Sequence, residues 1–464
     1  MKEAAGRESG RNAALLTDLY QLTMLQAYWR EGLEARAAFS LFFRQLSPSR
    51  NYLIASGLDD VLAYLEELRF TEEALDYLRG LGFFGDAFLE WLAELRFTGD
   101  VYAMAEGTPV FPHEPLLEME APIGEAQLVE SILLNQIHLQ TVLASKAARV
   151  VAAARGRKVV DFAMRRMHGT DAALKGARAF YIAGVDATSN VLAGKLYGIP
   201  VSGTMAHSYV QAHQEELDGF REFLRLYPDT ILLVDTYDSL EGVRKVVQLA
   251  RELGGDFRAR GIRIDSGDLG TLARQAREIL DAAGLDTVEI FASGLLDEYG
   301  IARLVEQGAP ITGFGVGTRM GVSEDVPSID LAYKLTEYAG VGRQKLSPDK
   351  ATLPGRKQVF RIESGGAAER DVLAGSGESL PGRPLLHPVM KEGRRLASAS
   401  QTLEEIRARA AEEIAKLPER VRALALADPP YRVEVSEALR SQAERLRARL
   451  QGSAPEMADL ARDR

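Results

Sequence analysis

The stretch Gly198-Ile199-Pro200-Val201-Ser202-Gly203-Thr204-Met205-Ala206-His207-Ser208 decides how the rest of the chain is interpreted. A short apolar run ends at small polar residues and a glycine, and a helix is predicted over Ala206–Ala212. His207 therefore stands where a strand ends and a helix begins, the edge at which parallel α/β sheets bind their ligands. On residue type alone a capping or packed histidine is the commoner role. The residues that accompany it further along the chain favour a functional one.

The composition is that of a soluble globular protein with more than one domain. The chain has 464 residues, 46% of them hydrophobic and 26% charged, and can bury large cores. Its net charge of −10 argues against nucleic acid or an anionic membrane as the main partner. Because there is no cysteine, disulfides, thiolate catalysis and cysteine metal sites are excluded. We find no apolar signal segment and no uncharged run of membrane-spanning length, so we expect a cytoplasmic protein.

A long helix predicted over 124–155 separates two patterns. Beyond it, short apolar strands alternate with helices, which predicts parallel pairing with right-handed crossovers. With six or seven such units, a closed or nearly closed barrel is favoured over an open sheet. The predicted strands are Lys158–Phe162, Val185, Val201, Thr230–Val234, Gly261–Ile264, Val288–Phe291 and Ile311–Gly313.

We therefore expect three parts. Residues 1–12 form a disordered tail, 13–125 together with 330–464 form one domain, and 126–329 form the barrel. The arginine-rich run over 440–449 is interpreted as the solvated face of a helix, as charge runs on helices usually are.

Two of the predicted strand ends carry charged side chains without a glycine turn. Arg165 and Arg166 follow the first strand and could hold a phosphate or carboxylate through paired donors, or form surface ion pairs. Asp235 follows Ile231–Val234 and is the better ligand candidate in its loop, because Asp238 with Glu241 fits a capping box.

The other strand ends combine charge with glycine. Strand alternation puts Arg263 and Asp265 on one face, where they suit an anionic, hydroxyl-bearing ligand or form an internal ion pair. Gly315, Gly317 and Thr318 could bring backbone amides and a hydroxyl close to a phosphate, with Gly294 forming a second wall. The set fits a phosphorylated sugar better than a redox cofactor, because no Gly-x-Gly-x-x-Gly follows a strand. A Walker-type loop is also absent.

These residues fall in motifs that resemble the nicotinate phosphoribosyltransferase family over about residues 13–360. The motifs occur in the same order as in the family, which makes the resemblance highly specific. They are Leu16–Met24, Phe42-Phe43-Arg44, Arg165-Arg166, Ser189–Gly194, Gly203–Ser208, Asp235–Asp238, Arg263–Leu269 and Phe314–Thr318.

The resemblance implies a fold and an activity. The fold is α/β, an irregular (β/α) barrel of the type II phosphoribosyltransferase kind with a second, smaller α/β domain from the N- and C-terminal parts. The activity is the ligase-class joining of nicotinate to 5-phosphoribosyl 1-pyrophosphate, giving nicotinate mononucleotide and pyrophosphate in NAD salvage. It is coupled to ATP hydrolysis and expected to need Mg²⁺. Family members are homodimers with a shared active site.

The resemblance also implies residue roles. His207 is transiently phosphorylated by ATP, and Asp265 and Arg165 complete the catalytic set. Asp265 meets the ribose hydroxyls or magnesium, and Asp235 is the expected metal ligand. For nicotinate, the resemblance implies that Tyr20 from the partner subunit and Phe162 sandwich the pyridine ring, and that Thr204 and Arg263 bind the carboxylate. Arg166 beside Arg165 is expected at the pyrophosphate, and Ser208 is also expected to bind substrate. The residues expected at the 5′-phosphate are Gly294, Gly315, Gly317 and Thr318.

Two positions depart from the family pattern. Ala163 stands where a glycine is frequent, and Met320–Ser323 lacks the usual threonine, for which Ser323 could substitute. A relative that uses nicotinamide carries an aspartate at the position of Asn190, so a neutral residue there favours the acid, by at least about tenfold.

Other classes fit the sequence less well. Quinolinate phosphoribosyltransferase needs a more basic pocket and lacks the histidine motif. A barrel lyase or aldolase would use a Schiff-base lysine or a bound metal. Few lysines fall at strand ends, and the spacing of a metal cage is absent. A non-catalytic phosphosugar-binding protein would keep the glycine loops without needing His207.

Overall fold

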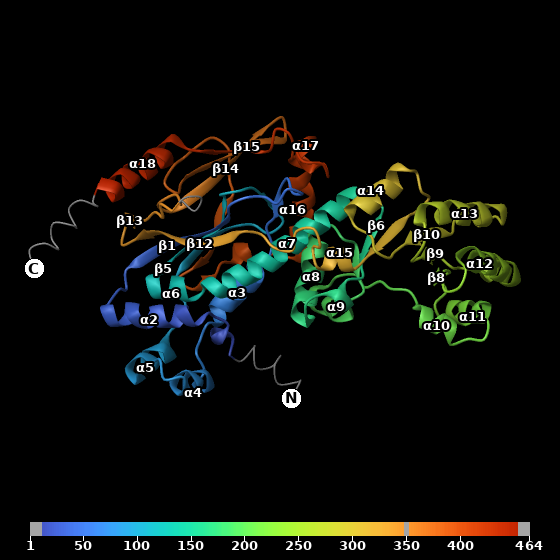
Figure 1. Ribbon diagram of the computed structural model, residues 1–464, viewed down its shortest axis with the longest axis horizontal. Coiled ribbons are helices and arrows are strands. Elements are labelled where there is room, and N and C mark those ends of the chain that lie inside the picture. The colour runs from blue at the N-terminus through green and yellow to red at the C-terminus, as the bar shows by residue number, and fades with distance from the viewer. Residues whose placement is uncertain (1–11, 348–351, 453–464) are drawn as a thin grey trace, which may run out of the picture. The chain divides into compact units, whose positions relative to one another are not determined.

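The structure, a computed structural model, describes residues 12–347 and 352–452 (Figure 1). The chain divides into two compact units, Val142–Pro327 and the combination of Met1–Thr141 with Ser328–Arg464. The first boundary falls inside a helix rather than at residue 126, and the N- and C-terminal unit is the longer of the two. Apart from Asn12, the tail predicted for residues 1–12 lies outside the described residues.

The unit Val142–Pro327 is built on a six-stranded parallel sheet in the order β7-β6-β11-β10-β9-β8. Its strands are short and mostly buried because most of their residues are apolar. They are β6 (Lys158–Asp161), β7 (Ala187–Thr188), β8 (Ile231–Leu233), β9 (Gly261–Ile264), β10 (Glu289–Ala292) and β11 (Gly313–Val316).

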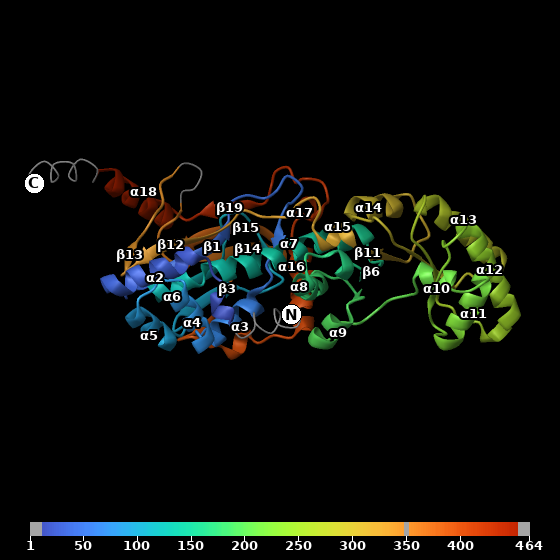
Figure 2. The ribbon, with the colours of Figure 1, turned by 60° about the horizontal axis from the view of Figure 1, so that its bottom comes forward.

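Helices connect successive strands, and four of them (α9, α12, α13 and α14) follow an aspartate or asparagine whose side chain accepts a hydrogen bond from the helix backbone. Figure 2 shows α10 to α13 gathered at one end of this unit, and Figure 1 shows β8 and β9 beside them. The helices are α8 (Thr170–Ile182), α9 (Val191–Tyr197), α10 (His207–Gln211), α11 (Glu216–Leu226), α12 (Ser239–Leu253), α13 (Leu269–Ala282), α14 (Glu298–Glu306) and α15 (Thr318–Gly321).

The sheet is an open version of the predicted barrel. A single parallel bridge between Thr188 and Val201 extends it beyond β7. Within the described residues no pairing joins Val201 to β8, so the sheet does not close on itself. The predicted alternation of strands and helices and the irregular, barrel-like sheet are confirmed, and among the described residues the strand pairing stops short of full closure.

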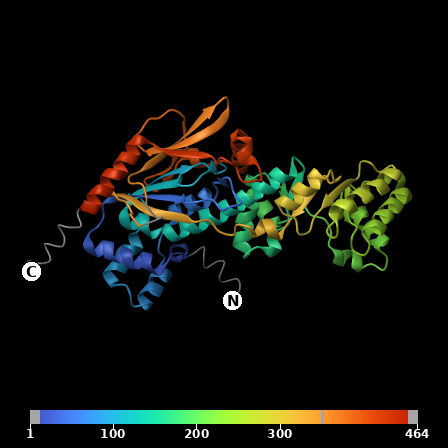
Figure 3. The ribbon, with the colours of Figure 1, turned by 45° about the horizontal axis from the view of Figure 1, so that its top comes forward.

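The other unit contains a seven-stranded sheet in the order β13-β12-β1-β5-β3-β17-β18, whose internal pairings are antiparallel. Strands from both ends of the chain share it, and they can be followed by colour in Figure 3. They are β1 (Arg36–Phe43), β3 (Asp100–Met104), β5 (Pro115–Pro122), β12 (Leu331–Tyr338), β13 (Val341–Gly342), β17 (Leu386–Lys391) and β18 (Arg394–Arg395).

Two smaller sheets and several helices complete this unit. A four-stranded sheet consists of β16 (Arg383–Pro384), β14 (Lys357–Ser364), β15 (Ala367–Gly375) and β19 (Arg432–Val435). A separate antiparallel pair is formed by β2 (Leu53–Ile54) and β4 (Pro109–Val110). The helices are α2 (Leu19–Glu31), α3 (Leu58–Glu67), α4 (Glu72–Gly80), α5 (Asp86–Glu94), α6 (Ile123–Leu128), α16 (Leu403–Lys416), α17 (Glu419–Arg422) and α18 (Glu437–Gly452).

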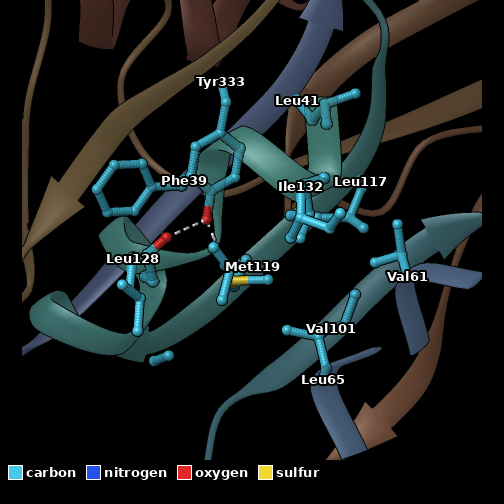
Figure 4. Packing of buried hydrophobic residues seen from close by; sticks show 14 of the residues in the cluster. Phe39, Leu41, Val61, Leu65, Val101, Leu117, Met119, Leu128, Ile132 and Tyr333 are labelled. Carbon is cyan, nitrogen blue, oxygen red and sulfur yellow. Dashed lines mark hydrogen bonds between the residues drawn. The ribbon is translucent and has the colours of Figure 1, made fainter. Parts of the chain in front are cut away.

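The core of this unit joins the two ends of the chain directly. The ring of Phe39 on β1 stacks on that of Tyr333 on β12, with centroids 4.8 Å apart (Figure 4). The Tyr333 hydroxyl, fully buried, donates to the Ala126 carbonyl at 2.9 Å. Burying each large apolar side chain stabilises the fold by about 1.5–3 kcal/mol.

Two predicted elements differ in detail, and the prediction for a third, the arginine-rich run, is confirmed. The helix predicted over 124–155 is two helices, α6 and α7 (Glu130–Ala154). The last barrel strand is Gly313–Val316 rather than Ile311–Gly313, so Gly315 lies inside a strand. The arginine-rich run lies on α18, which buries Leu439, Ala443 and Leu446 and exposes most of its other side chains.

No helix in the described part of the chain combines the length and apolarity that crossing a bilayer requires.

Candidate active site

Most of the predicted site residues lie at the carboxyl edge of the parallel sheet. Phe162, Arg165 and Arg166 follow β6, Asp235 follows β8, and Asp265 follows β9. Gly294 follows β10, Gly317 and Thr318 follow β11, and His207 is the first residue of α10. Because the strands are parallel, all these loops emerge at one edge.

The His207 imidazole faces polar groups. Its Nδ1 lies 3.1 Å from Thr236 Oγ1, and its Nε2 lies 3.9 Å from Asp265 Oδ2. The side chain is 40% exposed, so it is not packed into hydrocarbon. Ser208, also placed in the site by the sequence, is the second residue of α10. Thr236 lies within the Asp235–Asp238 motif, but the sequence predicts no role for it. Its contact with His207 arises only because the fold brings the two loops together.

Asp265 is held from two sides. Ser293 Oγ donates to its Oδ1 at 2.5 Å, and Arg263 Nη2 lies 3.5 Å from the same oxygen. The prediction that Arg263 and Asp265 share a face is therefore confirmed. Ile262 and Ile264 on the opposite face are buried.

Asp235 fixes the loop after β9. Its Oδ2 accepts from the Asp265 backbone N at 2.9 Å and from Ser266 Oγ at 2.6 Å. Its Oδ1 is buried and has no hydrogen-bond partner among the described residues. The described residues contain no cluster of three His, Cys, Asp or Glu side chains suited to a metal ion, so the metal role of Asp235 remains a prediction.

Arg263 lies beside the ring of Phe162. Its guanidinium carbon is 5.8 Å from the ring centroid, and its Nη1 donates to Thr204 Oγ1 at 2.5 Å. Burial lowers the pKa of Arg263, and the charges of Asp265 and Asp235 oppose that shift. An arginine remains protonated under such conditions. The group is thus a largely desolvated cation next to an aromatic ring.

Gly315 makes room for Phe162. A Cβ at Gly315 would lie 2.4 Å from Phe162 Cε2. Gly315 pairs with Val160 in the ladder with β6 and therefore lies in a strand, not in a loop. The absence of a side chain at this position leaves room for the Phe162 ring. The loop that follows β11 begins at Gly317. The ring of Phe291 closes the other side of Phe162, with centroids 6.2 Å apart.

Asp161 shapes the turn that carries the arginines. Its two carboxylate oxygens accept from Ala163 N and Thr188 Oγ1, both at 2.7 Å, and it is 1% exposed. Burial raises the pKa of this carboxyl. Arg165 and Arg166 leave this turn exposed, and neither has an ion-pair partner within 12–347 and 352–452. Apart from its place at a strand end, no sequence pattern indicated a role for Asp161.

Two positions discussed from the sequence are structural. Asn190 is 2% exposed, caps α9 by accepting from Ala193 N, and donates to the Ala173 carbonyl. Its amide therefore does not face a bound ring, and the substrate preference argued from it loses its support. Ser323 is buried and donates to the Val326 carbonyl at 2.7 Å, so it does not replace a phosphate-binding threonine.

Ala163, which stands where the family frequently has a glycine, packs against the loop after β11. A Cβ on Gly321 would lie 2.6 Å from Ala163 Cβ, and one on Gly317 would lie 3.3 Å from the Phe162 carbonyl. The turns after β6 and β11 are therefore in close contact. The methyl group of Ala163 is accommodated because residue 321 is a glycine.

Tyr20 belongs to the other unit, on α2. It is 49% exposed, and its hydroxyl donates to Glu130 Oε2 at 3.4 Å. Its predicted contact with a bound ring stays a prediction.

An open parallel sheet with arginines, carboxylates, glycine turns and a histidine at one edge defines an α/β protein equipped for a phosphorylated ligand. Comparisons with known proteins make this specific. Three family profiles match: the nicotinate phosphoribosyltransferase N-terminal domain at residues 15–138, the nicotinate phosphoribosyltransferase family at 157–343, and the nicotinate phosphoribosyltransferase C-terminal domain at 381–443. The chain belongs to the nicotinate phosphoribosyltransferase family.

Individual relatives agree. The chain is 56% identical to nicotinate phosphoribosyltransferase pncB2 of Mycobacterium tuberculosis, covering 94% of each chain. It is 43% identical to the Bacillus subtilis nicotinate phosphoribosyltransferase, covering 81% of this chain and 79% of that one. The crystal structure of human nicotinic acid phosphoribosyltransferase superposes with a TM-score of 0.82 at 29% identity, covering 93% of this chain and 99% of that chain.

Proposed function

We propose that this chain joins nicotinate to 5-phosphoribosyl 1-pyrophosphate in NAD salvage, and that ATP hydrolysis drives the reaction through a phosphohistidine at His207, as in an ATP-dependent ligase forming a C–N bond. The observation that carries the proposal is the exposed His207 ring, set between Thr236 and Asp265 at the sheet edge that also bears the arginines and glycine turns.

The ring of nicotinate is proposed to lie against Phe162, with its carboxylate directed to Arg263 and Thr204. A desolvated guanidinium binds a carboxylate more strongly than an exposed one does. Tyr20 of the partner subunit would cover the opposite face of the ring in a homodimer. Preference for the acid over the amide therefore rests on Arg263 rather than on Asn190.

Phosphoribosyl pyrophosphate would meet the exposed pair Arg165 and Arg166 with its pyrophosphate. Its 5′-phosphate would lie at Gly294, Gly317 and Thr318, where backbone N–H groups and a hydroxyl are available. As the C1′–O bond breaks, positive charge develops on the ribose and negative charge on the pyrophosphate. Asp265 and the arginines stabilise these charges, and the nitrogen of nicotinate forms the new bond at C1′.

Magnesium fits the acidic pair of this edge. Mg²⁺ prefers carboxylate oxygens; Asp265 is one third exposed and Asp235 Oδ1 has no partner among the described residues. These two residues would hold the ion, which would offset the charge of the pyrophosphate.

His207 acts as a nucleophile toward ATP. A lone pair on the imidazole forms a bond to the γ-phosphorus as the bond to the bridging oxygen breaks, and ADP leaves with that electron pair. The Asp265 carboxylate near Nε2 and the Thr236 hydroxyl near Nδ1 fix the orientation of the ring.

Transfer of label from γ-³²P-ATP onto the protein tests the proposal. We expect acid-labile labelling of the wild type and none of His207→Ala, which retains weak phosphoribosyl transfer. His213→Gln is the matched control, because His213 lies just beyond α10 and bonds Tyr209 O outside the site. Normal labelling of His207→Ala would refute the assignment.

A further inference from the structure

Two charged connections join the loop after β10 to the loop after β11. These loops carry Gly294 and Gly317. Asp297 caps α14 with Oδ1, which accepts from Gly300 N at 2.8 Å, and its Oδ2 accepts from Arg319 Nη1 at 2.6 Å. Arg319 is the second residue of α15. The ion pair therefore runs from the end of one glycine loop to the end of the other.

A second connection is buried behind the first. Lys146 Nζ on α7 lies 2.5 Å from Glu298 Oε2 and 2.8 Å from Asp325 Oδ1. The side chain of Lys146 is 2% exposed and that of Glu298 is 0% exposed. Arg149 also binds Glu298, at 2.9 Å. Breaking one of these ion pairs would leave a buried charge without a partner, which is energetically costly. The cluster therefore holds the two loops firmly in place.

The outer pair is accessible to mutation. Asp297 and Arg319 are 19% and 35% exposed in their side chains. The guanidinium of Arg319 is engaged twice, by Asp297 through Nη1 and by Glu324 through Nε at 3.0 Å. Both partners lie beside the glycine loops rather than in them. Two of the nitrogen atoms of Arg319 are thus engaged in contacts beside the loops.

We infer that Arg319 is a positioning residue for the phosphorylated sugar: through Asp297 it fixes the spacing of the two glycine loops without touching the ligand. The inference rests on the proposed function, which places the 5′-phosphate at Gly294 and Gly317. When the two loops are already held at the right distance, less of the binding free energy is lost in ordering them around the ligand. Loss of the pair should therefore weaken binding of the sugar phosphate selectively.

Three variants test the pair. Asp297→Asn keeps a good helix cap but removes the charge that binds Arg319. Arg319→Gln removes the cation, and the double variant removes both. We expect each single variant to raise the KM for phosphoribosyl pyrophosphate, and the Kd for ribose 5-phosphate measured by calorimetry, about fivefold. The double variant should be no worse than either single variant, because both substitutions remove one interaction. Arg319→Lys should recover part of the loss.

Two controls isolate the effect. Glu324→Gln removes the other partner of Arg319, which lies on the same loop, and Arg303→Gln removes an exposed charge from α14. Both should keep the KM for phosphoribosyl pyrophosphate within about twofold of the wild type. The KM for nicotinate and the labelling of His207 by ATP should stay unchanged in every variant.

The inference is overturned if Arg319→Gln leaves the KM for phosphoribosyl pyrophosphate unchanged, if the single effects add in the double variant, or if both KM values rise together with a fall in Tm. Failure of the proposed function is a separate outcome. In that case the wild type itself would neither bind ribose 5-phosphate nor turn over phosphoribosyl pyrophosphate.

Discussion

Single residues in this protein owe their roles to neighbours that are distant in the sequence. Arg263 and Asp265 were assigned to one face by strand alternation alone, and the contact between them agrees. Thr236 and Ser293 touch His207 and Asp265 only because three different strands end side by side. Short-range patterns carry no information about such contacts. For the same reason Asn190 was misjudged: nothing local separates a helix cap from a ligand contact.

At Gly315, adding a methyl group should displace the ring of Phe162. In Gly315→Ala the new Cβ would lie 2.4 Å from Phe162 Cε2 and 3.1 Å from Phe291 Cε1. We expect a loss of about 1–3 kcal/mol in the free energy of unfolding, since overpacking a core costs that much. The KM for nicotinate should rise as well. Gly255→Ala, where nothing lies within 4 Å, is the matched control for urea unfolding and kinetics.

Arg263 should decide between the acid and the amide. Arg263→Gln replaces a largely desolvated cation by a shorter, neutral amide. We expect the ratio of kcat/KM for nicotinate to that for nicotinamide to fall about tenfold or more, because the carboxylate loses a charged partner. Thermal unfolding of the variant serves as a check on folding. An unchanged ratio would remove Arg263 from the nicotinate site.

At the scale of elements, periodicity predicted the order of strands and helices well and their boundaries less well. Ile311 and Thr312 look like strand residues, yet the ladder with β6 and β10 begins at Gly313. The shift moves Gly315 from a loop into a strand and changes its role. The choice between a closed and a nearly closed barrel was left open by the sequence, because it depends on pairing between Val201 and β8, which local patterns do not reveal.

The four-stranded sheet contains a buried charged cluster with a measurable pH dependence. Arg361 on β14 donates to both carboxylate oxygens of Asp371 on β15, and both side chains are 0% exposed. Burial, followed by the neighbouring charge of Asp371, raises the pKa of Glu114 well above its usual range. The folded protein therefore keeps a proton on Glu114 that the unfolded chain has lost.

A carboxyl group with a raised pKa contributes stability below its unfolded pKa, and that contribution is lost as the pH rises through the folded value. Glu114→Gln should thus gain stability relative to the wild type as the pH rises from about 5 to 9. Urea unfolding across that range measures the gain. Glu369→Gln, an exposed position on β15, should show no such trend, and a constant offset for Glu114→Gln would contradict the assignment.

At the scale of the whole molecule, a shared active site can be tested by mixing inactive variants. If Tyr20 completes the site of the partner subunit, Tyr20→Ala and His207→Ala damage different halves of each site. A mixed dimer then holds one site with both defects and one with neither. We expect activity to return when the two variants are unfolded together and refolded as a mixture. Each variant refolded alone is the control. Continued inactivity of the mixture would place Tyr20 in the site of its own chain.

The pairing of β1 with both β5 and β12 has a consequence for biosynthesis. One neighbour of β1 leaves the ribosome early, whereas the other, Leu331–Tyr338, follows the whole inserted unit Val142–Pro327. Until then a nascent polypeptide presents the bare edge of β1, whose unpaired N–H and C=O groups can template the addition of foreign strands. Products that terminate after Pro327 but before Leu331 should therefore accumulate in inclusion bodies, even though their inserted unit is complete.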